Sequence, residues 1–158
     1  MTIHQLRYDH PDAQRLIEEV QGEYVARYGG RDGSQIASGE FDPPHGLFVV
    51  AYDRDEPVAA GGWRRHDPGA YGGLPGRDPA EIKRMYVATN ARGRGFARAV
   101  LAYLEDTAHS AGVDWLVLET GQRQPEALAL YRSSGYGDVP HFGTYADAPE
   151  AVHLGKPL

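Results

Sequence analysis

The sequence predicts an α/β fold of the α+β type, in which about four helices flank a central mixed sheet. Apolar residues recur with a period near 3.6 in at least two segments, which indicates helices that pack on a sheet. Short β-branched runs occur first as a hairpin and later as strand–helix–strand units, so antiparallel and parallel strands are both expected. The chain has 158 residues and shows no linker or internal repeat, which predicts a single domain over residues 1–158.

The first half is predicted to contain, in order, a strand, a helix, a loop or short helix, and a β-hairpin, over residues 2–9, 12–27, 31–45 and 46–65. The helix carries Leu16, Val20 and Tyr24 at a spacing of four, and the glycine pair 29–30 ends it. The hairpin has its turn at residues 53–57, between two runs of strand-forming residues.

The second half begins with a glycine- and proline-rich loop over residues 67–79. Strands are predicted at 81–87, 113–120, 136–139 and 151–156, with helices that begin near 95 and 125 and end at glycines 112 and 135. The first of these helices has a clear 3.6-residue period, formed by Phe96, Val100, Leu101, Leu104 and Ala108. The strand at 113–120 is strongly apolar and is expected near the centre of the sheet.

Composition excludes several classes of protein. The absence of cysteine excludes disulfides, thiolate metal sites and a cysteine nucleophile, and the seven histidines lack HxH or HxxxH spacing, so no metal site is expected. No long apolar run or signal core is present, which favours a cytoplasmic protein. The net charge of −6, from 22 acidic and 16 basic residues, argues against binding to nucleic acid or to anionic membranes.

A glycine loop, VATNARGRGFARAVLAYL at residues 87–104, joins a predicted strand to a predicted helix. Basic residues cluster around it: Lys83, Arg84, Arg92, Arg94 and Arg98. Free N–H groups and the dipole at a helix N-terminus attract anions, and Gly93 and Gly95 allow the backbone to approach a ligand closely. The loop is therefore expected to hold a phosphate group at one place.

Three phosphate-binding motifs compete for this loop. A P-loop requires GxxxxGK[ST], which is absent. A dinucleotide motif, GxGxxG, matches at Gly93 and Gly95, and Glu119 ends the next strand, but Arg98 replaces the third glycine. The segment RGRGFA at 92–97 matches the acyl-CoA pyrophosphate signature R/Q-x-x-G-x-G/A. A glycine turn that only starts a helix remains an alternative.

With RGRGFA and a second motif, the chain resembles the GNAT superfamily of acyl-CoA-dependent N-acyltransferases. The second motif, A-x-x-L-Y-x-x-x-G-[FY], occurs at 127–136 as ALALYRSSGY, and the match covers about residues 81–136 in the family's order. The segment LETG…QPEALALYRSSGY followed by HFGTY resembles a bacterial small-molecule branch. The resemblance implies the GNAT-type fold and direct transfer of an acetyl group from acetyl-CoA to a primary amine, in a ternary complex.

The resemblance also implies which residues bind acetyl-CoA. The backbone of Met85, Tyr86 and Val87 is expected to face the pantetheine arm and to polarise the thioester carbonyl. The pyrophosphate is expected on Arg92, Gly93, Arg94, Gly95, Phe96 and Ala97. Gln124 stands where the family often has asparagine, from which it is expected to hydrogen-bond the pantetheine.

Amide formation requires a base for the amine and an acid for the departing thiolate. Glu81 lies at the strand position where several family members have a glutamate base, and it is the first candidate; Glu119, at the end of the adjacent strand, is the second. An ion pair of Glu81 with Lys83 or Arg84 is an equally open explanation. Tyr131 matches the family's general-acid tyrosine, with a purely aromatic packing role as its alternative.

The acceptor is expected to be a small-molecule or peptide amine. The acidic net charge favours cationic amines through electrostatic steering. A homodimer is compatible with the sequence, but no pattern in it defines the oligomeric state. The alternative function is that of a GNAT-like acyl-CoA-binding protein with little or no transferase activity, which loss of the base or a blocked acceptor site would produce.

Overall fold

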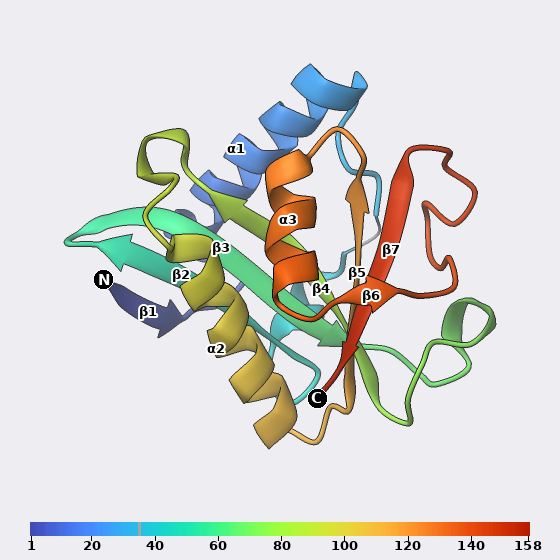
Figure 1. Cartoon of the computed structure of the whole chain (residues 1–158). Coiled ribbons are helices and arrows are strands. Elements are labelled where there is room, and N and C mark those ends of the chain that lie inside the picture. Colours follow the sequence, from blue (N-terminus) through green and yellow to red (C-terminus); the bar gives the residue numbers. More distant parts are fainter. Residues whose placement is uncertain (35) are drawn as a thin grey trace.

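The computed structural model of the protein describes residues 1–34 and 36–158 (Figure 1). Its strands are β1 (Thr2–Gln5), β2 (Gly46–Asp53), β3 (Glu56–Arg65), β4 (Pro79–Val87), β5 (Trp115–Gly121), β6 (Gly137–Asp138) and β7 (Ala151–Pro157). Its α-helices are α1 (Pro11–Tyr28), α2 (Phe96–Ser110) and α3 (Pro125–Ser133). Three short 3-10 helices span Ser38–Phe41, Ala70–Gly72 and Thr89–Ala91.

The predicted α/β mixed-sheet fold is confirmed, but the described residues form three α-helices instead of about four. In the stretch 31–45, of which residue 35 lies outside the described residues, the structure contains only the 3-10 helix Ser38–Phe41. Gly39, Pro43 and Pro44 explain this difference, since glycine loses most conformational entropy in a helix and proline cannot donate a backbone hydrogen bond.

All seven strands belong to one sheet, in the order β1-β2-β3-β4-β5-β7-β6. The predicted hairpin is present as the antiparallel pair β2 and β3, and β4 and β5 form the parallel pair. A parallel pair requires a long crossover connection, which α2 provides. The first strand is shorter than the predicted 2–9, because a turn between Arg7 and His10 ends it.

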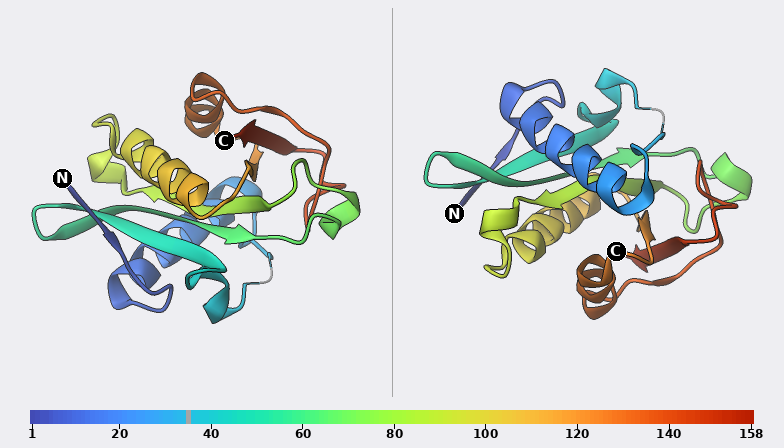
Figure 2. Two further views of the ribbon diagram at one scale, coloured as in Figure 1. Left: turned by 90° about the horizontal axis from the view of Figure 1, so that it is seen from below. Right: turned by 90° about the horizontal axis from the view of Figure 1, so that it is seen from above.

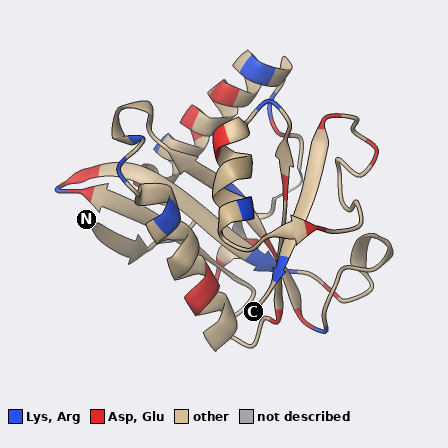
Figure 3. Ribbon diagram, in the orientation of Figure 1, with Lys and Arg blue, Asp and Glu red and all other residues tan. Residues whose placement is uncertain are grey.

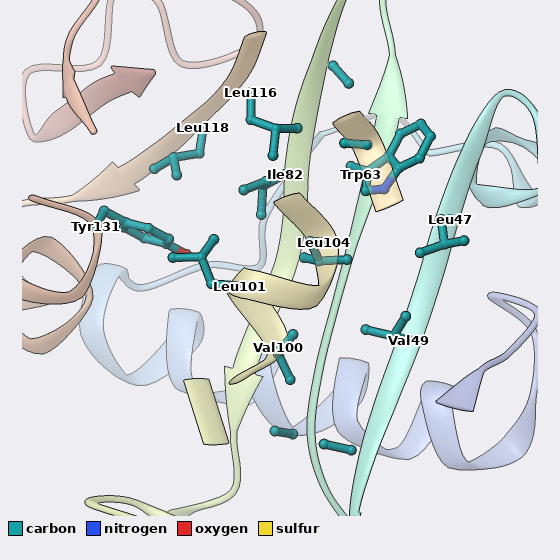
Figure 4. Close-up of a cluster of buried hydrophobic side chains, with 14 of the residues drawn as sticks. Leu47, Val49, Trp63, Ile82, Val100, Leu101, Leu104, Leu116, Leu118 and Tyr131 are labelled. Atoms are coloured by element: carbon teal, nitrogen blue, oxygen red, sulfur yellow. The ribbon is translucent and has the colours of Figure 1, made fainter. Parts of the chain in front are cut away.

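The helices cover the two faces of the sheet. Figure 2 shows α1 on one face and α2 with α3 on the other. The larger core lies beneath α2 and α3 and includes Trp63, Ile82, Leu104, Leu116 and Leu118 (Figure 4). The smaller core, under α1, includes Leu16, Val20, Phe41, Phe48 and Val50. Among the described residues, no helix has both the length and the hydrophobicity that crossing a bilayer requires.

The periodic residues of the predicted helices are where the pattern requires them. All five apolar residues predicted along α2 are buried. Leu16 and Val20 of α1 are also buried, whereas Tyr24 is half-buried near the end of that helix. The 3.6-residue pattern therefore identified the buried faces correctly. Tyr24 packs against the edge of the smaller core.

The central strands β4 and β5 stay together over a short distance only. Their parallel pairing consists of three residue pairs, between 79–81 and 115–117. Beyond these pairs β4 continues beside β3, and β5 continues beside β7 to Gly121, so the two strands diverge (Figure 1). The sheet therefore has a gap between its two central strands, β4 and β5, beyond these pairs.

Strand β4 contains a bulge just after this point. Ala60 pairs with Tyr86 and Gly62 with Lys83, so two residues of β4 lie opposite one residue of β3. Arg84 has φ 61°, in the left-handed region that residues with a side chain rarely occupy. A bulge bends the strand and changes the direction of its side chains.

Candidate active site

A pocket of about 490 Å³ lies between β4 and β5 at the place where they diverge. The end of α1, the loop after it, α3 and the loop before β7 complete its walls. Its lining includes the polar side chains of Tyr24, Asp32, Lys83, Arg84, Glu119, Gln124, Tyr131 and Tyr145. The opening in the sheet thus forms a pocket beside several of the predicted functional residues.

The pocket has one wall on each face of the sheet. Tyr131 of α3 and Leu118 of β5 belong to the core beneath α2 and α3 (Figure 4). Glu119 follows Leu118, and because successive side chains of a strand point to opposite faces, it points toward the α1 face. The pocket therefore joins the α3 side of the sheet to the α1 side.

Among the polar side chains of the pocket, Tyr24, Glu119 and Tyr131 make no hydrogen bond to any other described residue. Burial raises the pKa of Glu119 to about 7, although nearby Lys83 opposes the rise. Burial also raises the pKa of the Tyr131 and Tyr24 hydroxyls above the usual range, so both keep their protons at neutral pH. A carboxylate and hydroxyls without protein partners are free to bind a ligand.

A second group of pocket residues is fully paired and centres on Asp32. Its Oδ2 accepts hydrogen bonds from Lys83 Nζ at 3.0 Å and from Arg84 Nη1 at 2.6 Å. Its Oδ1 accepts from the Tyr145 hydroxyl at 3.0 Å and from the Ser34 backbone N–H at 2.9 Å. Burial alone would raise the pKa of Asp32, but Lys83, Ser34 and Arg84 outweigh burial and hold that pKa well below its usual range.

The bulge in β4 explains how consecutive residues bind one carboxylate. In a regular strand Lys83 and Arg84 would point to opposite faces of the sheet. The left-handed conformation of Arg84 breaks this alternation, and both side chains reach Asp32. Their side chains are 7% and 5% exposed. A strained backbone conformation of this kind persists only where surrounding contacts hold it, and such positions are common at functional sites.

Glu81, the first candidate base, lies in a separate paired cluster and does not line the pocket. Its Oε1 accepts from Arg64 Nη2 at 3.0 Å and lies 2.9 Å from His66 Nε2. Arg64 Nη1 also donates to Glu40 at 2.5 Å. Burial would raise the pKa of Glu81, but His66, Lys83 and Arg64 together hold it below its ordinary value. The hydrogen-bonded partners of Glu81 are therefore Arg64 and His66, not Lys83 or Arg84.

The glycine loop has the backbone geometry of an anion site. Gly93 and Gly95 have φ 74° and 86°, which favour glycine, and an added Cβ would meet no atom within 4 Å at either position. The first backbone hydrogen bond of α2 runs from Ala99 N–H to Gly95 C=O at 3.1 Å. The N–H groups of Phe96 and Ala97 therefore have no partner within the helix and face the loop with its positive dipole end.

The arginines of this loop are not free cations. Arg92 forms an ion pair with Glu23 of α1, and Arg94 pairs with Asp53 at the hairpin tip at 2.8 Å. Figure 3 shows basic positions in the loop before α2 and both acidic and basic positions at the tip of the β2–β3 hairpin. Arg98 donates to Ser133 Oγ at 2.7 Å. The charges of Arg92 and Arg94 are therefore balanced by nearby carboxylates, whereas the partner of Arg98 is a neutral hydroxyl. Backbone N–H groups, more than side chains, give the loop its capacity for a phosphate.

The structure brings some of the predicted site residues to the pocket but not all of them. Met85, Gln124 and Tyr131 line it, whereas Tyr86 and Arg94 line a separate cavity of about 1000 Å³ between α1 and the hairpin. Gln124 Nε2 donates to the Tyr28 hydroxyl at 3.4 Å. Within the described chain, the remaining predicted residues line neither cavity: Glu81, Val87, Arg92, Gly93, Gly95, Phe96 and Ala97. Val87 C=O accepts from Arg92 Nε at 3.0 Å.

Tyr24 and Asp32 are among the pocket residues that were not predicted as site residues. Tyr24 was assigned only to the apolar face of a helix, and Asp32 follows a glycine pair in a stretch without a motif. Asp32 is 51 positions from Lys83 in the sequence. No local pattern connects such distant residues, so only the folded arrangement reveals the cluster.

Known proteins are similar to this chain in sequence and in fold. Residues 9–136 match the model of the acetyltransferase (GNAT) family. A relative from Azospirillum brasilense, named IAA acetyltransferase, is 33% identical over 144 residues, which are 91% of this chain and 89% of the relative.

Solved structures of similar fold extend over almost the whole chain. A Klebsiella pneumoniae protein assigned to the acyl-CoA N-acyltransferases is 26% identical, with a TM-score of 0.78 over 99% of this chain and 97% of the other. A GNAT family acetyltransferase from Elizabethkingia anophelis, solved with acetyl-CoA bound, is 18% identical, with a TM-score of 0.66 over 99% and 97% of the two chains. The second likeness concerns the fold alone.

Proposed function

Since the chain belongs to the acetyltransferase (GNAT) family and is an acyl-CoA-dependent acyltransferase, we propose that it transfers an acetyl group from acetyl-CoA directly to a primary amine of a small molecule or peptide. The observation that carries this proposal is the pocket that joins the two faces of the sheet and contains an unpaired carboxylate and an unpaired phenol. Both groups are of the kind that amide formation requires. We further propose that the chain acts as one domain, because both halves contribute strands to one sheet.

Glu119 is the residue that we assign as general base. An alkyl ammonium has a pKa near ~10.4 and must lose a proton before its nitrogen can attack. A base works best when its pKa lies near the working pH, and burial raises the pKa of Glu119 to about 7. Glu81 is less suited to this role, because Arg64 and His66 occupy its carboxylate and its pKa is below the ordinary value.

Tyr131 is the residue that we assign as general acid. Its raised pKa keeps the hydroxyl protonated, and that hydroxyl has no other partner among the described residues. Acetyl-CoA supplies an acetyl thioester whose carbonyl carbon an amine can attack. Glu119 first takes a proton from the ammonium and releases it to solvent. The nitrogen–carbon bond then forms and the carbon–sulfur bond breaks, while Glu119 takes the second proton of the nitrogen and Tyr131 gives its proton to the sulfur. Proton transfer from Glu119 back to Tyr131 restores the enzyme.

The glycine loop and the edge of β4 are suited to hold acetyl-CoA. Unpaired N–H groups at the start of α2, beside two glycines with positive φ, suit a pyrophosphate. Beyond the three residue pairs with β5, the edge of β4 from Met85 to Val87 has no strand partner among the described residues. Arg92 Nε already donates to Val87 C=O there, and the rest of this edge suits the amide groups of pantetheine. Met85 and Gln124 line the pocket that would receive the thioester.

The experiment that tests this function measures release of free CoA thiol from acetyl-CoA with a panel of amines. We expect sustained release only when an acceptor amine is present, and a new amide of the acceptor by mass spectrometry. Tight binding of CoA without release for any peptide, polyamine, aminoglycoside or amino acid would instead favour the acyl-CoA-binding alternative.

A further inference from the structure

We infer that the acceptor carries an acidic group, such as a carboxylate, close to the amine that is acetylated. The inference rests on the proposed function, because it names the substrate class of the same pocket. Its basis is the pair of buried cations on the α1 side of the pocket, Lys83 and Arg84, which both contact the one carboxylate of Asp32 and retain unused hydrogen-bond donors.

Lys83 and Arg84 bring two positive charges to the wall of the pocket, and Asp32 lies between them with one negative charge. The side chains are at most 8% exposed, so water compensates the remaining positive charge poorly. A buried charge that lacks a partner is costly, and a ligand that supplies the opposite charge removes that cost. An anionic group of the acceptor fits this requirement.

The two cations also retain hydrogen-bond donors. The ammonium group of Lys83 has three N–H donors, of which two are used, by Asp32 and by Ser34 Oγ at 2.9 Å. The guanidinium of Arg84 uses Nη1 for Asp32 and Nε for the Tyr8 hydroxyl at 3.5 Å, and its Nη2 makes no bond within the described residues. Both oxygens of Asp32 are already occupied, so the unused donors are available to a ligand carboxylate.

Several charged groups at the rim of the pocket and on β4 have partners of their own. At the rim, Arg31 pairs with Glu18 through two hydrogen bonds, and Arg123 pairs with Glu150 at 2.9 Å. Glu81, on β4, is hydrogen-bonded to buried Arg64 and to His66, and Lys83 acts on it through space without contact. Among the described residues, Asp32 is therefore the carboxylate that Lys83 and Arg84 contact directly.

Two further carboxylates near these clusters are Glu40 and Glu119. Glu40, the second partner of Arg64, is 39% exposed and faces solvent. Glu119 is left for the amine, since it is the unpaired carboxylate of the pocket. An acceptor with an ammonium and a carboxylate would then match Glu119 with one end and the Lys83–Arg84 pair with the other. A polyamine would bring a second cation toward Lys83 and Arg84, where like charges oppose binding.

The first test uses pairs of acceptors that differ only in the carboxylate: tyrosine and tyramine, phenylalanine and 2-phenylethylamine, and lysine and cadaverine. The rate of CoA release gives kcat/KM for each compound. We expect the carboxylate-bearing member of at least one pair to exceed its partner by tenfold or more. Equal values, or a preference for the decarboxylated amines, would overturn the inference while leaving the transferase function intact.

The second test removes one cation. Lys83→Met nearly keeps the length of the side chain but leaves Arg84 and Asp32 as a neutral pair. The ratio of kcat/KM between the carboxylate-bearing acceptor and its decarboxylated partner is therefore expected to fall to about one. The matched control is Arg7→Gln, which removes an exposed cation paired with Asp9 outside the pocket. If Lys83→Met retains the full preference, the pair does not recognise the acid.

A binding measurement separates this inference from the transferase proposal. Titration calorimetry compares the binding of N-acetyltyrosine with that of N-acetyltyramine, which are product-like and need no reaction. We expect the acid to bind wild type at least tenfold more tightly, and Lys83→Met to remove most of this difference. Equal binding of the two compounds, or no binding of either, overturns the inference, whether or not any amine reacts. If the acid binds more tightly but no amine reacts, only the transferase function is overturned.

Discussion

Glu119 of β5 and Tyr131 of α3 line one pocket from opposite faces of the sheet, and neither side chain has a hydrogen-bond partner within the described residues. This arrangement depends on the separation of β4 and β5 after only three residue pairs. In a continuous sheet the two side chains would be separated by paired backbone. The opening therefore allows a base on one face and an acid on the other to act on one reaction.

The variant Glu119→Gln is expected to reduce kcat by about 10²-fold or more while the affinity for CoA stays close to that of wild type. Gln has nearly the same shape as Glu but cannot accept the proton of the amine. The matched control is Glu81→Gln, which changes a carboxylate held by Arg64 and His66 outside the pocket. We expect this control to lower the melting temperature and to reduce kcat less than Glu119→Gln does. The reverse ranking in kcat would assign the base to Glu81.

The variant Tyr131→Phe keeps the aromatic ring and removes the proton, so we expect kcat to fall by about 10²-fold. Tyr24→Phe is a matched control, because Tyr24 lines the same pocket with an unpaired hydroxyl but comes from α1. Its effect on kcat is expected to stay below about tenfold. Steady-state rates of CoA release for both variants test this ranking, and wild-type turnover in Tyr131→Phe would exclude an acid role for Tyr131.

Glu119 is expected to reduce the stability of the protein as the pH rises. Its pKa is raised from the ordinary value of 4.5 to about 7, so between these pH values the folded protein binds more protons than the unfolded chain. Stability therefore falls as the pH increases from 4.5 to 7, and the full cost of about 3 kcal/mol is present above pH 7. Denaturant unfolding should show Glu119→Gln more stable than wild type at pH 8, with this advantage lost at pH 4. A difference between the two proteins that does not change with pH would contradict the raised pKa.

Asp32 is expected to be important for stability as well as for the shape of the pocket. Asp32→Asn removes the charge that Lys83 and Arg84 share and leaves both cations buried without a carboxylate. Breaking a buried ion pair in this way typically costs about 3–5 kcal/mol. The control, Asp138→Asn, removes the carboxylate of an exposed pair with Arg132 and should change the melting temperature little. Similar melting temperatures for the two variants would show that the Asp32 cluster adds no stability.

Much of the fold was predictable because its signals are local. The buried residues of α2 follow a 3.6-residue period, and the hairpin of β2 and β3 lies between clear turn residues. The same holds for the loop at Gly93 and Gly95, since the backbone conformation that it requires favours glycine at these two positions. The count of helices was too high, because glycine and proline between 31 and 45 reduced an expected helix to one 3-10 turn.

The sequence by itself determined the fold class, the family and the candidates Tyr131, Glu81 and Glu119, because each depends on short motifs or on periodic patterns in neighbouring residues. The tertiary structure alone decided which carboxylate lies in the pocket and which carboxylate is paired. That distinction depends on where β4 and β5 separate and on contacts with Arg64 and His66 across strands. Exposure, pairing and pKa are properties of side chains brought together from distant positions, so no local pattern encodes them.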